Sequence, residues 1–273
     1  MKLSEIYQIA DSIAPKRLSD TYCKMYGAYD NSGLLVEACE EVQGILFTLD
    51  LTNAAIDEAL ERNVNLIITH HPVIYGKIGS ICMGDEKLLG EKLIRCAKNG
   101  ISVISMHLNL DVAKGGIDES LMDGIYASAS KTKGACMRSD IKIQAPVEEG
   151  GYGRCYDIPT ISLGELAEEM KKEFSTQRIV VYGDVTKEVT RVASFCGAGG
   201  DEEGVLYAKR EGADVVVSAD FRHHVVALAV ESGMALLVMT HYASENYGFK
   251  NYYEKIRQQV QIPCVYHTDD CLL

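Results

Sequence analysis

The sequence lacks three features that would assign it to a specialised class of protein. Its nine cysteines include no CxxC pair, which argues against a zinc ribbon and against the disulfide framework of a small secreted protein. No apolar stretch approaches the roughly 20 residues that a membrane span requires. Basic residues are a minority, since the formal net charge is -12. This charge argues against nucleic acid as a partner, because phosphate backbones are bound by clustered Lys and Arg.

The rest of the composition is typical of a globular protein. Of the 273 residues, 47% are hydrophobic, which is enough to bury a large core. The scattered cysteines, odd in number, fit a reducing cytoplasm best. The first residues, MKLSEIYQIADSIAP, place Glu5 and Asp11 among apolar residues at helical spacing. We therefore expect an amphipathic helix there and no signal peptide.

Two regions of the chain repeat one pattern of strand, helix, strand, helix and strand, which we interpret as an internal duplication. Alternating strands and helices imply a largely parallel arrangement in each region, so the expected fold is α/β with two similar halves. The expected strands lie at residues 42–50, 65–72 and 101–111 in the first region, and at 189–200, 213–224 and 234–245 in the second.

The expected boundaries follow from this pattern. Residues 1–127 form the first half and residues 161–273 form the second. Residues 128–160 are rich in glycine and polar residues and contain Pro146 and Pro159. We expect them to form a linker with one or two edge strands.

Polar side chains gather where the expected strands end. A single buried histidine is more often structural than a metal ligand, but the repeated placement in both halves favours a functional site. Six of the seven histidines lie at such ends, namely His70, His71, His107, His223, His224 and His241, beside the acidic residues Asp111, Asp220 and Glu245.

The adjacent pair His70 and His71 raises a geometric question. Successive side chains of a strand point to opposite faces, so both imidazoles can reach one small site only if the backbone turns there. Pro72 favours such a turn, because it restrains His71 and removes a backbone donor. The pair then suits two neighbouring metal ions, with one imidazole for each.

Carboxylates complete the expected ligand set. His241 and Glu245 share a face if a helix begins just after the last strand, since they are four residues apart. A glutamate can bridge two cations, which lie about 3.5 to 4 Å apart in hydrolytic two-metal sites. Asp111 completes a mixed nitrogen and oxygen set, which favours Zn, Mn, Fe, Co or Ni over Ca or Mg. The expected ligands of two divalent metal ions are His70, His71, Asp111, His241 and Glu245.

Two further motifs leave alternatives open. Asp220, His223 and His224 are either substrate contacts or an N-cap aspartate followed by two first-turn histidines. The glycines of GAGG, residues 197–200, form either an anion-binding helix start or an ordinary tight turn. The acidic residues that follow them favour the turn, because they would repel a phosphate.

Several segments resemble the Nif-three-like proteins, commonly called GTP cyclohydrolase 1 type 2 homologues. They are THHPVIYGKIG, HLNLDVAKGGIDESL, VASFCGAGG, GADVVVSADFRHH and THYASE, with YDNSGL near the start. The resemblance covers nearly the whole chain and implies a duplicated α/β fold, a dinuclear metal centre between the halves and a ring-shaped homohexamer. The family's ligands fall on the five residues named above, with His107 beside them. Thr240 and Leu108 depart from the family, which usually has Gly and Thr or Ser there.

These features support two function hypotheses from different classes. The first is a metal-dependent hydrolase that acts on a nucleotide-like or phosphorylated small molecule, with His107 and Glu245 as the catalytic candidates and His107 as the proton shuttle. The resemblance names GTP cyclohydrolase chemistry, but a fold transfers its substrate poorly. The second is a metal-binding or regulatory hexamer without turnover, which stores or delivers ions or docks a partner. A third hypothesis is that the histidines are structural and bind nothing.

Overall fold

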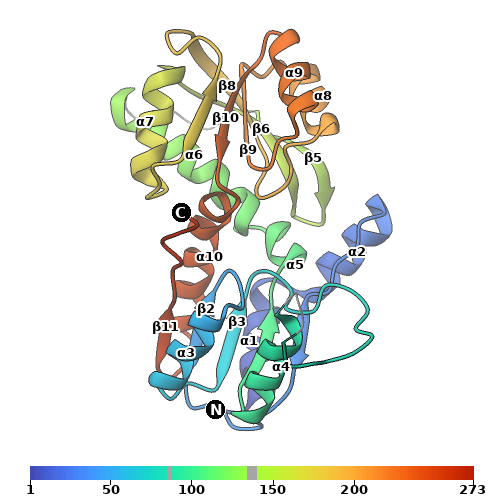
Figure 1. Cartoon of the computed structure of the whole chain (residues 1–273). Helices are drawn as coiled ribbons and strands as arrows, with labels where there is room; N and C mark the ends of the chain where they lie inside the picture. Colours follow the sequence, from blue (N-terminus) through green and yellow to red (C-terminus); the bar gives the residue numbers. More distant parts are fainter. Residues whose placement is uncertain (85–87, 134–139) are drawn as a thin grey trace. The chain divides into compact units, whose positions relative to one another are not determined.

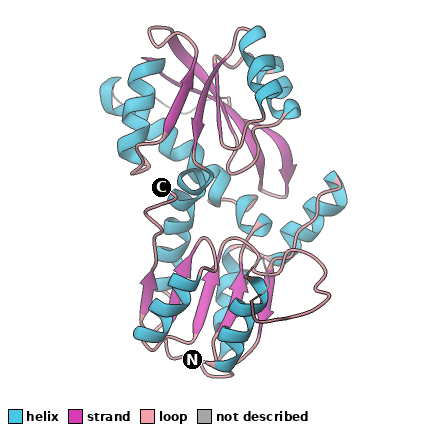
Figure 2. Ribbon diagram, viewed as in Figure 1, coloured by secondary structure: helices cyan, strands magenta, loops and turns pink. Residues whose placement is uncertain are grey.

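A computed structural model describes residues 1–84, 88–133 and 140–273 of the chain. The described residues form two compact units (Figures 1 and 2). Unit 1 contains Met1–Ala113 and Phe249–Thr268, and unit 2 contains Lys114–Gly248 and Asp269–Leu273. Each unit is built around one β-sheet with helices, so the expected α/β fold is confirmed.

The sheet of unit 1 has five strands in the order β1-β4-β3-β2-β11. The four strands from β4 to β11 run parallel, and only β1 is antiparallel to its neighbour. The strands are β1 (Gly33–Val36), β2 (Ile45–Thr48), β3 (Leu66–Thr69), β4 (Ser102–Ser105) and β11 (Cys264–Tyr266). The helices are α1 (Leu3–Ile13), α2 (Lys16–Tyr26), α3 (Asn53–Glu61), α4 (Leu89–Lys98) and α5 (Leu108–Asp111).

The central strands of this sheet are buried along their whole length because both faces are covered. Every residue of β2, β3 and β4 is buried, as expected for parallel strands between helices. One face, with Leu46 and Ile67, packs against α3 and α4. On the other face Phe47 meets the aromatic rings of the last helix, with a centroid distance of 6.2 Å to Phe249. This double cover leaves only the strand ends open for polar side chains.

The sheet of unit 2 has six strands in the order β5-β6-β8-β9-β10-β7. Strands β8, β9 and β10 are parallel, and β5, β6 and β7 pair antiparallel with their neighbours. The strands are β5 (Lys142–Val147), β6 (Gly150–Ser162), β7 (Ile179–Tyr182), β8 (Glu188–Ser194), β9 (Val215–Ser218) and β10 (Ala235–Met239). The helices are α6 (Ile117–Lys133), α7 (Leu163–Glu173), α8 (Glu202–Arg210), α9 (His223–Glu231) and α10 (His241–Arg257).

The strand order supports the expected internal duplication. Four strands of unit 1, β1-β4-β3-β2, have the same order and directions as β7-β10-β9-β8 of unit 2. In both sets of four strands a helix joins each pair of neighbouring parallel strands, α3 and α4 in the first set and α8 and α9 in the second. The ends of β3 and β4 therefore correspond to the ends of β9 and β10.

The domain boundaries differ from the expected ones. The range 128–160 contains the end of α6, strand β5 and most of β6, while residues 134–139 of that range lie outside the described residues. Strand β6 pairs with β5 on one side and β8 on the other, so this range is a folded part of unit 2 and not a linker. The second half is also not continuous, because the end of α10 and strand β11 belong to unit 1.

Three smaller features of the described residues can be compared with the sequence. Helix α1 confirms the amphipathic start of the chain, with Leu3, Ile6 and Ala10 buried on one side. Among the helices that the structure describes, none combines the length and apolar character needed to cross a bilayer. The cysteines that the structure describes carry free thiols.

Candidate metal centre

Three histidines cluster at the strand ends of unit 1. His70 and His71 follow β3, and His107 follows the neighbouring strand β4. The ring centroid of His70 lies 4.9 Å from that of His71 and 5.2 Å from that of His107. One ring nitrogen from each histidine lies within 4.8 Å of the other two, so the three imidazoles form a group that could hold a metal ion.

A turn in the backbone makes this cluster possible. The N–H groups of His70 and His71 both donate to the carbonyl oxygen of Leu49, at 3.2 and 2.9 Å. The chain therefore leaves the extended strand after Thr69, whose hydroxyl donates to the His71 carbonyl at 2.8 Å. The turn that the adjacent histidines required is confirmed, and both imidazoles reach the same strand end.

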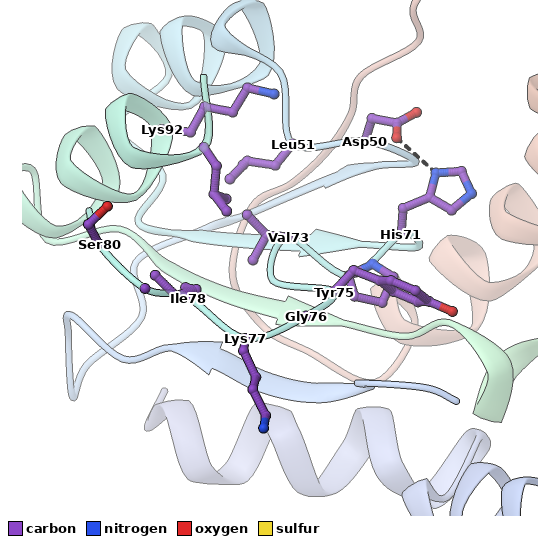
Figure 3. A pocket seen from close by; sticks show the side chains of 13 residues that line it. Asp50, Leu51, His71, Val73, Tyr75, Gly76, Lys77, Ile78, Ser80 and Lys92 are labelled. Carbon is purple, nitrogen blue, oxygen red and sulfur yellow. Dashed lines mark hydrogen bonds and ion pairs between the residues drawn. The ribbon is translucent and has the colours of Figure 1, made fainter. Parts of the chain in front are cut away.

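Each of these imidazoles is oriented by an oxygen atom at Nδ1. The Nδ1 of His70 lies 2.7 Å from the carbonyl oxygen of Met106. The Nδ1 of His71 lies 2.8 Å from a carboxylate oxygen of Asp50, as Figure 3 shows, and that of His107 lies 2.7 Å from Asp30. An oxygen partner at Nδ1 favours the tautomer with its proton there, which leaves the lone pair on Nε2. Metal-binding histidines in proteins have this arrangement.

A carboxylate of the same unit lies beside the cluster. The one-turn helix α5 carries Asp111, whose Oδ1 lies 3.5 Å from the Nε2 of His70. Both side chains are buried, His70 completely. Two ligands that each lie about 2.1 Å from one ion are separated by roughly 3 to 3.5 Å. His70 and Asp111 thus have the spacing of ligands that share an ion.

Unit 2 holds a second pair of donors at the start of α10. The Nε2 of His241 lies 3.1 Å from the Oε1 of Glu245, one helical turn later. The Nδ1 of His241 lies 2.6 Å from the Asp220 carboxylate. Like His71 and His107, His241 therefore has a carboxylate oxygen at Nδ1. Its Nε2 faces a carboxylate oxygen of Glu245.

The turn after β8 provides space for this second pair. Gly197 has φ +54, and a Cβ added to it would lie 2.2 Å from Glu245 Oε1 and 3.2 Å from His241 Nε2. Its N–H donates to the Ser244 hydroxyl at 3.0 Å. A glycine is therefore needed at position 197, because the Glu245 side chain approaches closely and because the backbone has a positive φ there. GAGG forms a turn, and the side chain of Asp201 caps α8 after it.

The structure also separates the alternatives for the motif SADFRHH. Asp220 is not an N-cap, because the cap of α9 is Arg222 and the Asp220 carboxylate instead accepts a hydrogen bond from His241. His223 and His224 are the first residues of α9, as the structural alternative predicts. Among the described residues they belong to none of the groups that could hold a metal ion.

Asp30 is a site residue that the analysis of strand ends missed. It precedes β1, within YDNSGL, and its fully buried carboxylate accepts hydrogen bonds from Ser19 and Ser32, both at 2.6 Å, in addition to His107. No strand-end pattern marks this position. Its only signal in the sequence was the resemblance of YDNSGL to an early family motif.

The hydrogen bonds around Asp30 shift two pKa values. Burial acts to raise the pKa of Asp30, but the hydrogen bonds from His107, Ser19 and Ser32 outweigh it and hold this pKa well below its usual range. Burial acts to lower the pKa of His107, but the hydrogen bond to Asp30 and the charge of Asp111 raise it above its usual value. Each partner thus stabilises the charged form of the other.

The low pKa of Asp30 predicts a pH-dependent effect on stability. In metal-free protein, Asp30→Asn should lower the free energy of unfolding at pH 7 by about 2 kcal/mol, the worth of hydrogen bonds to a charged group. A carboxylate whose pKa is lowered by folding stabilises above its unfolded pKa of about 3.9 and loses this contribution as the pH falls further. The difference from wild type in urea unfolding should therefore shrink between pH 5 and pH 3. A difference that stays constant over this range would contradict the assignment.

Comparisons with known proteins agree with this architecture. A family model described as Duf34/NIF3 (NGG1p interacting factor 3) matches residues 1–269. A protein of Clostridium acetobutylicum named GTP cyclohydrolase 1 type 2 homolog is 32% identical over 249 residues, which are 90% of this chain and 85% of that protein. A Schizosaccharomyces pombe protein named Protein NIF3 homolog is 28% identical over 250 residues, which are 89% of this chain and 84% of that protein.

Solved structures show the same fold. A Bacillus cereus protein described as related to NIF3 matches with a TM-score of 0.77 and 22% identity, over 99% of this chain and 98% of its own. Reduced HcgD from Methanocaldococcus jannaschii matches with a TM-score of 0.75 and 24% identity, over 97% of both chains. At these identities the likeness concerns the fold alone.

Proposed function

The chain belongs to the Duf34/NIF3 family, and we propose that it is a metal-dependent hydrolase that acts on a nucleotide-like or phosphorylated small molecule. The observation that carries the proposal is that the histidines at the strand ends combine clustering with a common orientation. His70, His71 and His107 each place a ring nitrogen within 4.8 Å of the other two, and each has an oxygen atom at Nδ1, at 2.7 to 2.8 Å. His241, at the start of α10, has the same orientation at 2.6 Å. An oxygen at Nδ1 alone also occurs in structural histidines, but metal ligands combine it with neighbouring ligand atoms.

As ligands of two divalent ions we propose the five residues expected from the sequence. Three imidazoles and two carboxylates form a mixed donor set that suits Zn, Mn, Fe, Co or Ni. An ion of this kind supplies Lewis-acid polarisation of a substrate oxygen and makes water more acidic. The residues are His70, His71, Asp111, His241 and Glu245.

His107 is the residue that we propose to move the proton. Its Nδ1 is held by Asp30, so its Nε2 can give or take a proton at the substrate while the ring keeps its orientation. The buried Asp30 carboxylate stabilises the protonated ring, because it stays charged throughout. The Tyr75 ring stands at right angles to the His107 ring, with a centroid distance of 6.2 Å.

Metal-loaded protein tests this function directly. It is screened against nucleotides, including GTP, and generic phosphoesters, each with and without a chelator. Glu245→Gln, which keeps the shape of the side chain but removes its charge, should lower turnover at least about tenfold. Full turnover in this variant would exclude the proposed site. No turnover with any of the metals would favour the alternative, a regulatory or storage protein that binds metal without catalysis.

We also propose, from the family resemblance, that the chain assembles as a homohexamer. Light scattering after size-exclusion chromatography measures the mass of the particle. A mass six times that of the chain agrees with the proposal, and a smaller one contradicts it.

A further inference from the structure

Unit 1 contains a cavity of about 650 Å³ that opens beside His71. This volume lies within the range of about 300 to 1,000 Å³ that small-molecule sites occupy. Asp50 and His71 lie at one end of the cavity, and the first turn of α4 lies at the other (Figure 3). A molecule bound there would therefore lie directly against one of the proposed metal ligands.

The charge of the cavity favours an anion. Its charged lining residues, apart from His71, are Lys77, Lys92 and Asp50, and the Asp50 carboxylate is already hydrogen-bonded to His71. Within the part of the chain that the structure describes, no carboxylate forms an ion pair with Lys92. Leu89, the first residue of α4, also lines the cavity, so the positive end of the helix dipole adds to the charge of Lys92.

The two lysines differ in how they lie. Lys92 is half-buried and extends from α4 toward Leu51, whereas Lys77 is exposed and points away from Leu51 and Val73 (Figure 3). A half-buried lysine interacts more strongly with an anion than an exposed one, since water screens its charge less. Lys92 is therefore the cation that a bound anion would meet.

A cavity in unit 2 provides a comparison. It also has a volume of about 650 Å³ and lies beside Asp220, the partner of His241. Its lining includes only Arg222 and His224 as basic residues. Four carboxylates line it as well, those of Asp201, Glu202, Glu203 and Asp220. An anionic group would be repelled there, so the charges of the two cavities favour the one in unit 1.

We infer that the cavity in unit 1 binds the phosphoryl group of the substrate against Lys92, with the rest of the substrate extending to His71. This inference rests on the proposed function and specifies the substrate class as a phosphorylated one. Tyr75 contributes an exposed ring to the lining, and its edge-to-face contact with Tyr29, at a centroid distance of 5.3 Å, fixes the ring plane. Such a ring can cover the organic part of the substrate.

Calorimetric titration of inorganic phosphate and of a nucleoside monophosphate tests the inference. The metal-loaded wild type is compared with Lys92→Met, which keeps most of the apolar stem of the side chain but removes its charge. We expect Lys92→Met to weaken both ligands at least about tenfold, since a charge-assisted hydrogen bond is lost. The matched control is Lys98→Met, because Lys98 lies on the same helix but does not line the cavity. It should bind both ligands as the wild type does.

Three outcomes would overturn the inference. Equal affinities in wild type and Lys92→Met would exclude Lys92 as the phosphate contact. Equal binding of the unphosphorylated nucleoside would exclude the phosphoryl group as the recognised part. A loss of bound metal in Lys92→Met, measured by elemental analysis, would assign the effect to the metal site. Wild-type protein that binds no metal would instead contradict the proposed function, and the phosphate titrations would still show whether Lys92 binds an anion.

Discussion

Replacing His70 with alanine should weaken the binding of a divalent ion to the protein by more than about a hundredfold. Residues that only orient a metal ligand are worth about 10- to 100-fold in affinity, and a ligand is worth more. His70 is fully buried, its Nδ1 is fixed by the Met106 carbonyl oxygen, and its Nε2 lies 3.5 Å from Asp111. Alanine removes this ring nitrogen. Titration with zinc or manganese, followed by calorimetry, measures the change.

Two further variants make the result specific. Asp50→Asn leaves the proposed ligand His71 in place but weakens its orientation, so it should lower the metal affinity only about 10- to 100-fold. His267→Ala removes a histidine of the same unit whose Nδ1 is paired with Glu58 at 2.6 Å. Among the described residues His267 belongs to no group that could hold a metal, so this variant should bind metal as the wild type does. Equal losses in all three variants would point to a general effect on folding and contradict the assignment.

Replacing Arg154 with methionine should lower the free energy of unfolding by about 3 to 5 kcal/mol, because it leaves a buried charge without its partner. Arg154 and Asp118 form an ion pair in unit 2 in which both side chains are almost completely buried. Asp118 also accepts hydrogen bonds from the backbone N–H groups of Gly153 and Cys196, at 3.0 and 3.1 Å. Urea unfolding of metal-free protein measures the loss of stability.

The control for this variant is an exposed ion pair of the same unit. Lys114 and Glu149 lie 3.0 Å apart with most of both side chains in water, so Lys114→Met should leave the stability unchanged. Similar results for the two variants would contradict the structural role of the buried pair. The Arg154 variant should also bind metal less tightly, because Cys196 is the neighbour of Gly197, which approaches Glu245 closely.

The strand ends show how far the sequence alone predicts the structure. Leu66, Ile67 and Ile68 form the buried strand that their apolar character predicts, and the chain turns at His70 and His71 as two adjacent histidines require. This prediction succeeds because strand burial and the alternation of side chains are local properties of the chain. The spacing of His241 and Glu245 on a helix is local in the same sense.

The glycine-rich range 128–160 shows why some of the fold could not be predicted from the sequence. Gly153 has φ +73, and a Cβ there would lie 2.6 Å from the ring of Phe195. At Gly151 a Cβ would lie 2.6 Å from the Ala145 carbonyl oxygen. These glycines allow close packing inside a sheet, and in the sequence they look the same as glycines of a flexible linker. Only the neighbouring strand β8 distinguishes the two cases.

Hydrogen-bonded pairs that are distant in the sequence could not be predicted either. His107 and Asp30 are 77 residues apart, and Asp220 and His241 are 21 residues apart. Neither distance corresponds to a helical or strand period, so no local pattern joins these residues. The sequence therefore identifies the histidines, but only the structure identifies the carboxylates that orient them.

Helix α10 has a consequence for work with fragments of this protein. The chain passes from unit 1 to unit 2 after Ala113, returns at Phe249 within α10 and leaves again after Thr268. A fragment that stops at Ala113 would lack Tyr252, which is buried and donates a hydrogen bond to the Ala10 carbonyl, and the edge strand β11. No single cut of the polypeptide yields two complete folding units. Separate expression of the two units therefore requires a circularly permuted or grafted gene.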